Sequence, residues 1–198
     1  MIDLNDDIFQ ILLVPPWENA GADHWMSVWQ RKYPRWQRVE QRNWFEPDKN
    51  EWVETLDRAI AGRETEDLIL VAHSLGTITL AHWANKFDRS AVKGALLVAP
   101  PDVERDDAPP EIQTFAPVPL AEFKFPSVVV ASENDNYISV DRARFFAKRW
   151  GSRFINIGRA GHINVKSGHG EWQHGEQILR EFVNRLYSRR EQLLNPKC

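Results

Sequence analysis

Short apolar runs alternate along the chain with longer segments in which apolar residues recur every three or four positions. The apolar runs predict strands at residues 9–14, 36–40, 68–72, 95–99, 127–132 and 153–157. The longer segments predict helices at residues 23–33, 52–60, 140–150 and 176–190, and another from the turn at 73–76 to about residue 87. This alternation is typical of an α/β fold, in which a mostly parallel central sheet has helices on both faces.

Residues 100–126 break the alternation and are rich in proline. The prolines are Pro100, Pro101, Pro109, Pro110, Pro117, Pro119 and Pro126. Because proline lacks a backbone N–H, we expect an irregular segment here. Two interpretations are open: an excursion over a cleft, or a surface connection with no part in catalysis. In either case the segment is too short for a large lid domain.

The length of 198 residues fits a single domain that spans residues 1–198. A domain of this size buries roughly 70% of the surface that its unfolded chain exposes, so we expect it to fold without a disulfide, metal or other cofactor. The one cysteine is Cys198, which leaves no partner for an intramolecular disulfide. The chain opens with Asp3, Asp6 and Asp7 instead of a signal-like sequence, which favours a cytoplasmic protein.

Charged residues of both signs are scattered along the chain, and the net charge is −3. No long block carries one sign, so nucleic acid is not an expected partner. No uninterrupted apolar stretch approaches the roughly 20 residues that cross a bilayer, so no membrane association is expected. We interpret Arg185, Arg189 and Arg190 as the solvated face of the last helix.

The segment Ala72-His73-Ser74-Leu75-Gly76 lies between the clearest predicted strand and a helix. Its spacing and placement resemble the G-x-S-x-G nucleophile elbow, where a serine occupies a tight strand-to-helix turn. The positions on either side must be small, because the two backbones approach each other closely. Ala72 departs from the usual glycine but is still small. Ser74 is therefore the candidate nucleophile.

A serine hydroxyl is a weak nucleophile at neutral pH and needs a base that a carboxylate orients. Asp135 is the favoured carboxylate, since it lies in the polar loop directly after the strand at 127–132. Glu133 and Asp141 are the alternatives. His162 is the favoured base, because it follows the last predicted strand in a loop that also contains glycine.

The other histidines have separate interpretations. Adjacent side chains of an extended segment point in opposite directions, so we predict that His73 packs beside Ser74 or supports the site. His24, His169 and His174 could join His162 around a metal. Their spacing matches no compact zinc pattern such as H-E-x-x-H, so no metal site is predicted.

The loop after the first predicted strand should supply one of two amides that bind an oxyanion. Pro15 and Pro16 lack an N–H, so the amide of Trp17 is the first usable donor there. The amide of Leu75, directly after the candidate nucleophile, is the expected second donor. Trp17 is also one of nine tryptophans, an unusual number, which we expect to form the core or to line an apolar cleft.

Several segments together resemble the small serine hydrolases related to retinoblastoma-binding protein 9, a compact branch of the α/β-hydrolases. They are Pro16-Trp17-Glu18-Asn19, Asp23-His24-Trp25 with Trp29, the segment from Ala72 to Gly76, Ser132 to Asp135 with Tyr137, and Gly161-His162-Ile163-Asn164. The resemblance spans almost the whole chain. It implies a reduced sheet without a lid, a triad of Ser74, Asp135 and His162, and hydrolase activity on small acyl substrates.

Trp17, Asn19, His24 and Trp25 are the candidate residues of the substrate pocket. Binding to the retinoblastoma pocket does not transfer, because the L-x-C-x-E motif linked with it is not found in this sequence.

Three functions are compatible with these residues. The favoured one is a serine hydrolase that cleaves small carboxylic esters, or related acyl substrates, through an acyl-enzyme on Ser74. An acyltransferase or perhydrolase would use the same triad with an acceptor other than water. The third is a non-catalytic module that binds a ligand or protein in an aromatic cleft. The expected lack of a lid domain favours a short acyl chain.

Overall fold

The computed structural model describes residues 3–4, 7–63 and 67–194, with side chains as far as residue 188, so Cys198 lies outside the described residues. Six parallel strands form one sheet in the order β2-β1-β3-β4-β5-β6. The strands are β1 Gln10–Val14, β2 Gln37–Arg38, β3 Leu68–His73, β4 Val92–Val98, β5 Ser127–Ala131 and β6 Arg153–Asn156. The predicted α/β fold is confirmed.

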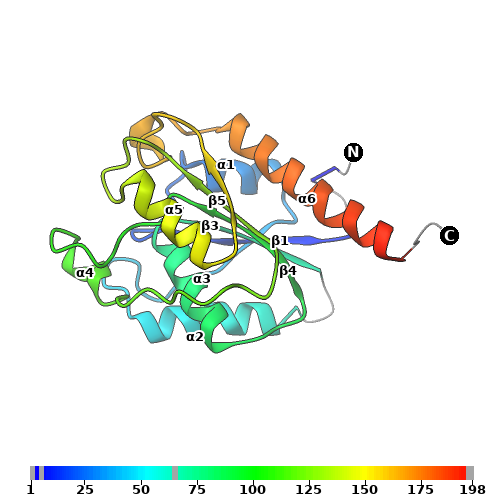
Figure 1. Cartoon of the computed structure of the whole chain (residues 1–198), viewed down its shortest axis with the longest axis horizontal. Helices are drawn as coiled ribbons and strands as arrows, with labels where there is room; N and C mark the ends of the chain where they lie inside the picture. Colours follow the sequence, from blue (N-terminus) through cyan, green and yellow to red (C-terminus); the bar gives the residue numbers. More distant parts are fainter. Residues whose placement is uncertain (1–2, 5–6, 64–66, 195–198) are drawn as a thin grey trace.

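Helices cover both faces of the sheet. They are α1 Trp25–Lys32, α2 Lys49–Ala61, α3 Leu75–Lys86, α4 Pro110–Gln113, α5 Val140–Arg149 and α6 Gln173–Leu194, with a 3-10 turn, η1, at Val165–Ser167. One apolar cluster joins the sheet to α1 and α6, and the other joins it to α2, α3 and α5 (Figure 1). The molecule is therefore a three-layer structure with the sheet in the middle.

The strand sequences explain this layering, because successive residues of a strand point to opposite faces. In β1, Leu12 and Val14 pack toward α2 and α3, whereas Ile11 and Leu13 pack toward α1 and α6. β3, between β1 and β4, is buried along its whole length. Burial on both faces is the reason why the central strands are continuous apolar runs without alternating polar residues.

Several element boundaries differ from the prediction. α1 begins at Trp25 because the ring of His24 caps it, with Nδ1 accepting from the Met26 amide at 3.2 Å. β2 has only two residues, and the side chains of Trp36 and Val39 on either side of it are buried in the core. α6 is longer than predicted at both ends.

The strand order places a ligand site at one edge of the sheet. β1 lies between β2 and β3 in the sheet. The chain therefore goes from β1 to β2 on one side and then crosses to β3 on the other side, from which the sheet continues to β6. In open α/β sheets, ligands bind at the carboxyl ends of the strands where this reversal occurs. The loop at residues 15–19 and the turn at Ser74 meet there. The loops after β5 and β6 open at the same edge, because all the strands are parallel.

Residues 100–126 contain only the four-residue helix α4 and are otherwise irregular. α4 lies at the same end of the molecule as the carboxyl ends of the strands (Figure 1). This segment forms no large lid, as predicted. One of its residues, Ile112, nevertheless reaches the cavity at Ser74.

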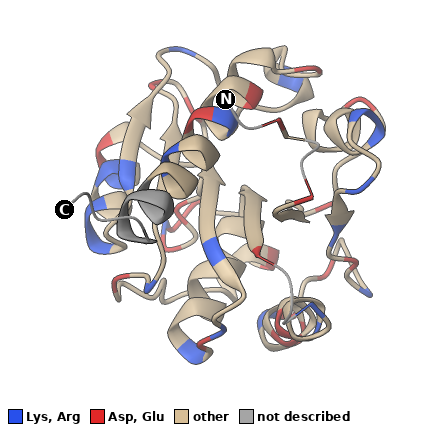
Figure 2. Cartoon of the chain, turned by 90° about the vertical axis from the view of Figure 1, so that its right-hand side faces the viewer, with Lys and Arg blue, Asp and Glu red and all other residues tan. Residues whose placement is uncertain are grey.

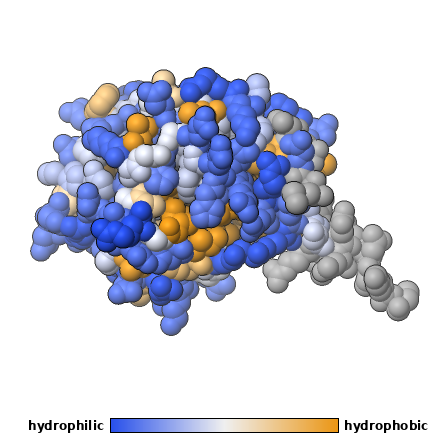
Figure 3. Space-filling view, turned by 90° about the horizontal axis from the view of Figure 1, so that it is seen from above, coloured by the Kyte–Doolittle hydropathy of each residue, from blue (hydrophilic) through white to orange (hydrophobic). Residues whose placement is uncertain are grey.

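The surface carries charges of both signs. Viewed from the end where α6 finishes, Lys and Arg are interspersed with Asp and Glu around the helices and loops (Figure 2). The face seen from above is largely hydrophilic, with an apolar area near its middle (Figure 3). In the part of the chain that the structure describes, no helix combines the length and apolar character needed to cross a membrane.

Candidate active site

Ser74 occupies the tight turn between β3 and α3. Its backbone has φ 51° and ψ −126°, a conformation that L-residues rarely adopt. Strained backbone of this kind is typical of the serine in a nucleophile elbow. Gly76, two residues later, lets the first turn of α3 touch the end of β1. The turn is therefore built against the loop that follows β1.

His162 joins Ser74 to Asp135. Its Nε2 lies 2.8 Å from Ser74 Oγ, and its Nδ1 lies 2.9 Å and 2.8 Å from the two carboxylate oxygens of Asp135. The Asp135 side chain is 0% exposed and that of His162 is 10% exposed. A carboxylate at Nδ1 holds the proton on that nitrogen, which leaves Nε2 to accept the hydroxyl proton. The arrangement can therefore activate Ser74 as a nucleophile.

The structure thus brings the three favoured residues together and leaves the alternative acids elsewhere. Glu133 is exposed and accepts a hydrogen bond from Asn156 Nδ2 at 3.0 Å. Asp141 is exposed in the first turn of α5. The contacts described for these two carboxylates do not include His162.

Two polar side chains after β5 hold the loop that carries His162. Ser132 Oγ accepts from the Ala160 amide at 2.9 Å, and Asn134 Oδ1 accepts from the Gly161 amide at 2.9 Å. Both bonds fix the loop from the strand that also positions Asp135. Neither side chain was expected to have a role of its own. A serine and an asparagine directly before the candidate acid are the signal that could have indicated one.

His73, the residue before Ser74, supports the same loop. Its Nε2 lies 3.0 Å from the carbonyl oxygen of His162, and the two rings are 5.2 Å apart between centroids. The Nε2 must carry a proton to donate to this carbonyl, so Nδ1 is the unprotonated nitrogen. This contact is the supporting role predicted for His73.

Two backbone amides are available beside Ser74. Among the described residues, the amides of Trp17 and Leu75 donate to no acceptor, although Trp17 shares a cavity with Ser74 and Leu75 follows it directly. The loop after Trp17 is sharply bent, with φ of 62° at Glu18 and 63° at Asn19. These amides are free to bind an oxygen that becomes negatively charged.

Arg38 from β2 stabilises this bent loop. Its Nη1 donates to Asn19 Oδ1 at 3.0 Å and to the Ala20 carbonyl at 3.1 Å, while Nη2 donates to Ser27 Oγ at 2.7 Å. Asn19 Oδ1 also accepts from the Ala20 amide at 2.7 Å. Sequence reasoning missed Arg38, because a single arginine in a short predicted strand gives no signal of this role.

A cavity of about 200 Å³ opens at Ser74. Three of the four predicted pocket residues, Trp17, Asn19 and His24, line it. Ile112 and Tyr137 add apolar surface, and the Tyr137 ring lies 4.4 Å from the ring of His162. The cavity is smaller than most small-molecule sites.

Trp25 does not line this cavity, which corrects its predicted place in the pocket. Its side chain is 0% exposed, and Nε1 donates to the Ile163 carbonyl at 2.9 Å. Neighbouring residues of a helix point about 100° apart. Because His24 faces the cavity at the start of α1, Trp25 faces the core, where it packs against Trp29 and Trp172.

His24 and His73 are buried histidines beside the candidate triad, and both are neutral at pH 7 because their pKa values are lowered. Burial, followed by the nearby charges of Arg38 and His162, lowers the pKa of His24 to about 3. Burial also lowers the pKa of His73 well below the ordinary value. Two neutral rings place no extra positive charge beside His162 when it takes up a proton.

His169 and His174, the remaining candidate ligands, do not line the cavity at Ser74. His169 Nδ1 lies 3.1 Å from Ser167 Oγ, and burial lowers the pKa of His169. His174 is exposed on α6. Within the described ranges, no group of three or more metal-ligating side chains is found.

The parallel sheet, the serine in a strained strand-to-helix turn, and the carboxylate and imidazole loops at the same edge define an α/β-hydrolase. The chain matches the Serine hydrolase family over residues 11–181, and it belongs to that family.

Several solved structures are similar to the chain in fold. A putative YdeN-like hydrolase from Pectobacterium atrosepticum is 33% identical, with a TM-score of 0.79 over 90% of this chain and 92% of that chain. The ydeN gene product of B. subtilis is 18% identical, with a TM-score of 0.70 over 91% and 99% of the two chains. Esterase 2 of Thermogutta terrifontis, in its apo form, is 14% identical, with a TM-score of 0.67 over 92% and 85%. No curated protein matches the chain significantly.

Proposed function

We propose that the protein is an esterase that cleaves small carboxylic esters through an acyl-enzyme on Ser74. The observation that carries this proposal is the 2.8 Å contact between His162 Nε2 and Ser74 Oγ. Membership of the Serine hydrolase family supports hydrolysis, and esterases share the fold. The narrower likeness to the group related to retinoblastoma-binding protein 9 stays a prediction.

In the acylation step, Ser74 Oγ attacks the ester carbonyl carbon while His162 Nε2 takes the hydroxyl proton. The carbonyl oxygen becomes an oxyanion, which accepts hydrogen bonds from the amides of Trp17 and Leu75. Asp135 stabilises the imidazolium through its contacts with Nδ1. His162 then returns its proton to the departing alcohol as the C–O bond breaks.

In the deacylation step, a water molecule gives a proton to His162 and attacks the acyl carbon. The second tetrahedral intermediate uses the same two amides. It collapses to the free carboxylic acid, and the proton on His162 restores the Ser74 hydroxyl. Another nucleophile in place of water would give the acyltransferase or perhydrolase reaction.

The size of the cavity supports a short acyl chain. Its volume is about 200 Å³, and its lining beside the candidate nucleophile includes Ile112, Tyr137 and Trp17. A long chain would have to leave this space and lie on the open surface, where it gains little from burial. The esters of short acids are therefore the proposed substrate class.

A fluorophosphonate probe tests the nucleophile. We expect labelling of the wild-type protein at Ser74, located by peptide mass spectrometry, and no labelling of Ser74→Ala. The matched control, Ser90→Ala, changes a distant exposed serine and should label normally. A folded wild-type protein that resists the probe and a panel of p-nitrophenyl esters would favour the alternative of a ligand-binding module.

A series of p-nitrophenyl esters from acetate to dodecanoate tests the substrate class. We expect kcat/KM to be highest for the shortest chains and to fall once the chain exceeds the cavity. Products formed in the presence of an added alcohol or hydrogen peroxide identify the acceptor. Mainly transfer products would replace the hydrolase assignment by that of an acyltransferase or perhydrolase.

A further inference from the structure

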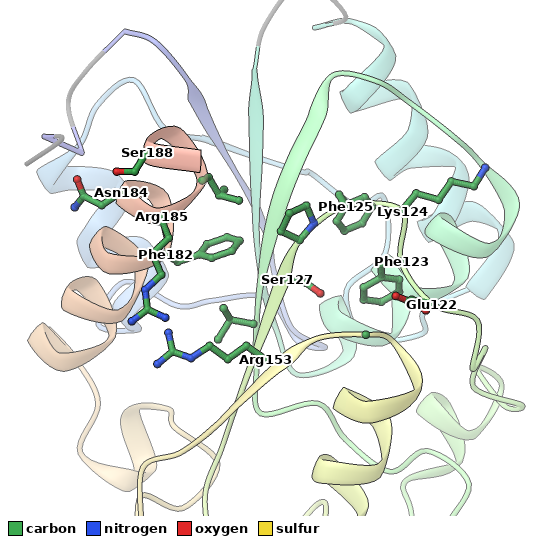
Figure 4. Close-up of a pocket in the computed structure, with 14 residues that line it drawn as sticks. Glu122, Phe123, Lys124, Phe125, Ser127, Arg153, Phe182, Asn184, Arg185 and Ser188 are labelled. Atoms are coloured by element: carbon green, nitrogen blue, oxygen red, sulfur yellow. The ribbon is translucent and has the colours of Figure 1, made fainter. Parts of the chain in front are cut away.

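A second and larger hollow lies at the end of the sheet opposite Ser74. This groove has a volume of about 740 Å³ and runs between the second half of α6 and residues 122–128 (Figure 4). It shares no lining residue with the cavity at Ser74. Its residues Ser127 and Arg153 begin β5 and β6, whereas the candidate triad follows the carboxyl ends of strands. A five-residue strand separates the two ends by roughly 17 Å.

Much of the lining of this groove is apolar. Phe182 and Leu186 come from α6, and Phe123 and Phe125 come from the segment before β5, with their rings stacked at 5.4 Å between centroids. Figure 4 shows the Phe182 ring on one side and the other two rings across the groove. Leu186 and Phe125 are only partly buried. The groove therefore offers apolar surface to a ligand, and its volume lies in the usual range for small-molecule sites.

One end of the groove carries two arginines. Arg153 and Arg185 both line the groove, and in Figure 4 their guanidinium groups are drawn on the same side of it. Neither group forms an ion pair or hydrogen bond with any residue that the structure describes. Glu181, one turn before Arg185, instead accepts from Gln177 Nε2 at 3.3 Å. An anion that reaches both guanidinium groups from within the groove would be stabilised by both charges.

The other charged groups of the groove do not compete for this position. Lys124 Nζ lies 2.7 Å from Asp88 Oδ2, so the charge of Lys124 is already paired. Glu122 lies on the opposite wall, away from the two arginines (Figure 4). A ligand with one anionic end would therefore place that end between the arginines and its apolar part along the phenylalanines.

We propose that this groove binds a medium-chain fatty carboxylate. The carboxylate lies between Arg153 and Arg185, whose planar forks match its two oxygens, and the alkyl chain lies along Phe182 and Phe125. The proposal does not depend on the chemistry proposed for Ser74. Occupation of the groove and acylation of Ser74 involve separate residues, so each can be measured while the other is blocked.

Isothermal titration with dodecanoate, below its micelle concentration, tests the proposal on protein whose Ser74 has been replaced by alanine. We expect one dodecanoate per chain. Arg153→Glu combined with Arg185→Glu should weaken binding at least about tenfold, because both charge-assisted contacts become repulsive. The control pair Arg31→Glu with Arg58→Glu makes the same charge change on α1 and α2, and should alter binding less than about twofold.

Chain length and head group test the two halves of the ligand separately. Decanoate, which is two methylenes shorter, should bind roughly 15-fold more weakly than dodecanoate, because each buried methylene contributes about 0.8 kcal/mol, or a factor of about four. Dodecanol, which has the same chain without the charge, should bind at least about tenfold more weakly. If reversal of the arginines unfolds the protein, Arg153→Gln with Arg185→Gln provides the milder variant, checked by circular dichroism.

Three results would overturn the proposal. The first is equal affinity of dodecanoate for the wild-type protein and for a folded double-arginine variant. The second is no detectable binding by the wild-type protein. The third is binding that disappears when the wild-type Ser74 is blocked by a phosphonate, which would place the carboxylate in the cavity at Ser74.

Discussion

A Cβ atom on Gly76 would lie 2.3 Å from the carbonyl oxygen of Val14. The same atom would lie 2.6 Å from the Pro15 carbonyl oxygen, and neither distance is possible without movement of the backbone. Gly76 belongs to the first turn of α3, and Pro15 begins the loop that contains Trp17. This contact therefore sets the distance between the two amides proposed to bind the oxyanion.

Gly76→Ala should consequently impair both folding and catalysis. Forcing the two backbones apart should lower the free energy of unfolding by about 1–3 kcal/mol. Displacing one oxyanion donor should lower kcat about 100-fold. Urea unfolding and ester hydrolysis measure the two effects. Gly21→Ala is the control, because a Cβ there meets nothing within 4 Å. Wild-type kcat in folded Gly76→Ala would contradict this account of the turn.

The fold followed from the sequence because its strands are buried on both faces. The continuous apolar run that became β3 could be recognised without tertiary information. The length of β2 could not be predicted from apolar character. Trp36 and Val39 are apolar because they are buried in the core, whereas the two residues that pair with β1 are Gln37 and Arg38. Local apolar character indicates burial, but it does not indicate which residues hydrogen-bond to the neighbouring strand.

Replacement of the carboxylate tests how His162 is oriented. Asp135→Asn should lower kcat about 10³–10⁴-fold with little change in KM, because an amide no longer favours the Nδ1 tautomer or stabilises the imidazolium. Steady-state hydrolysis of a short ester measures both constants. Glu133→Gln and Asp141→Asn make the same chemical change at the two rejected acids and should retain most of the activity. A larger loss in either control than in Asp135→Asn would reassign the acid.

Arg38 gives a prediction for a residue that does not touch Ser74. Arg38→Met removes the donors to Asn19 and Ser27 while keeping much of the side-chain volume. The loop that carries the Trp17 amide should then lose its fixed position, and kcat should fall about tenfold, with a smaller change in KM. Kinetics on a short ester measure this loss. Arg58→Met, on the exposed face of α2, is the control, and equal kcat in the two variants would rule out the positioning role.

The candidate site was predictable where function constrains local sequence. Ser74 lies in a recognisable turn, and Asp135 and His162 lie in loops directly after strands. Trp25 was misplaced because the one-residue offset from His24 decides which side of α1 faces the core. Ile112 comes from the proline-rich segment, and its approach to the cavity depends on a path that no local pattern specifies.

The burial of His24 predicts a pH dependence of stability. Its pKa is about 3 in the folded protein, compared with an ordinary value of 6.5. Between these values the unfolded chain binds the proton and the folded protein does not. The free energy of unfolding should therefore fall as the pH decreases from about 6.5 toward 3, and His24 alone accounts for about 2 kcal/mol at pH 5. His73 acts in the same direction, because burial lowers its pKa too.

His24→Asn separates this contribution from the rest of the acid response. Asparagine is a good helix N-cap, so it can still accept from the Met26 amide, but it does not titrate. Urea unfolding at pH 8 and pH 5 should show a smaller loss of stability in this variant than in the wild type, by about 2 kcal/mol. His174→Asn removes an exposed histidine and should leave the wild-type difference between the two pH values. An unchanged difference in His24→Asn would mean that His24 is protonated in the folded protein, and its place behind Ser74 as a neutral ring would have to be abandoned.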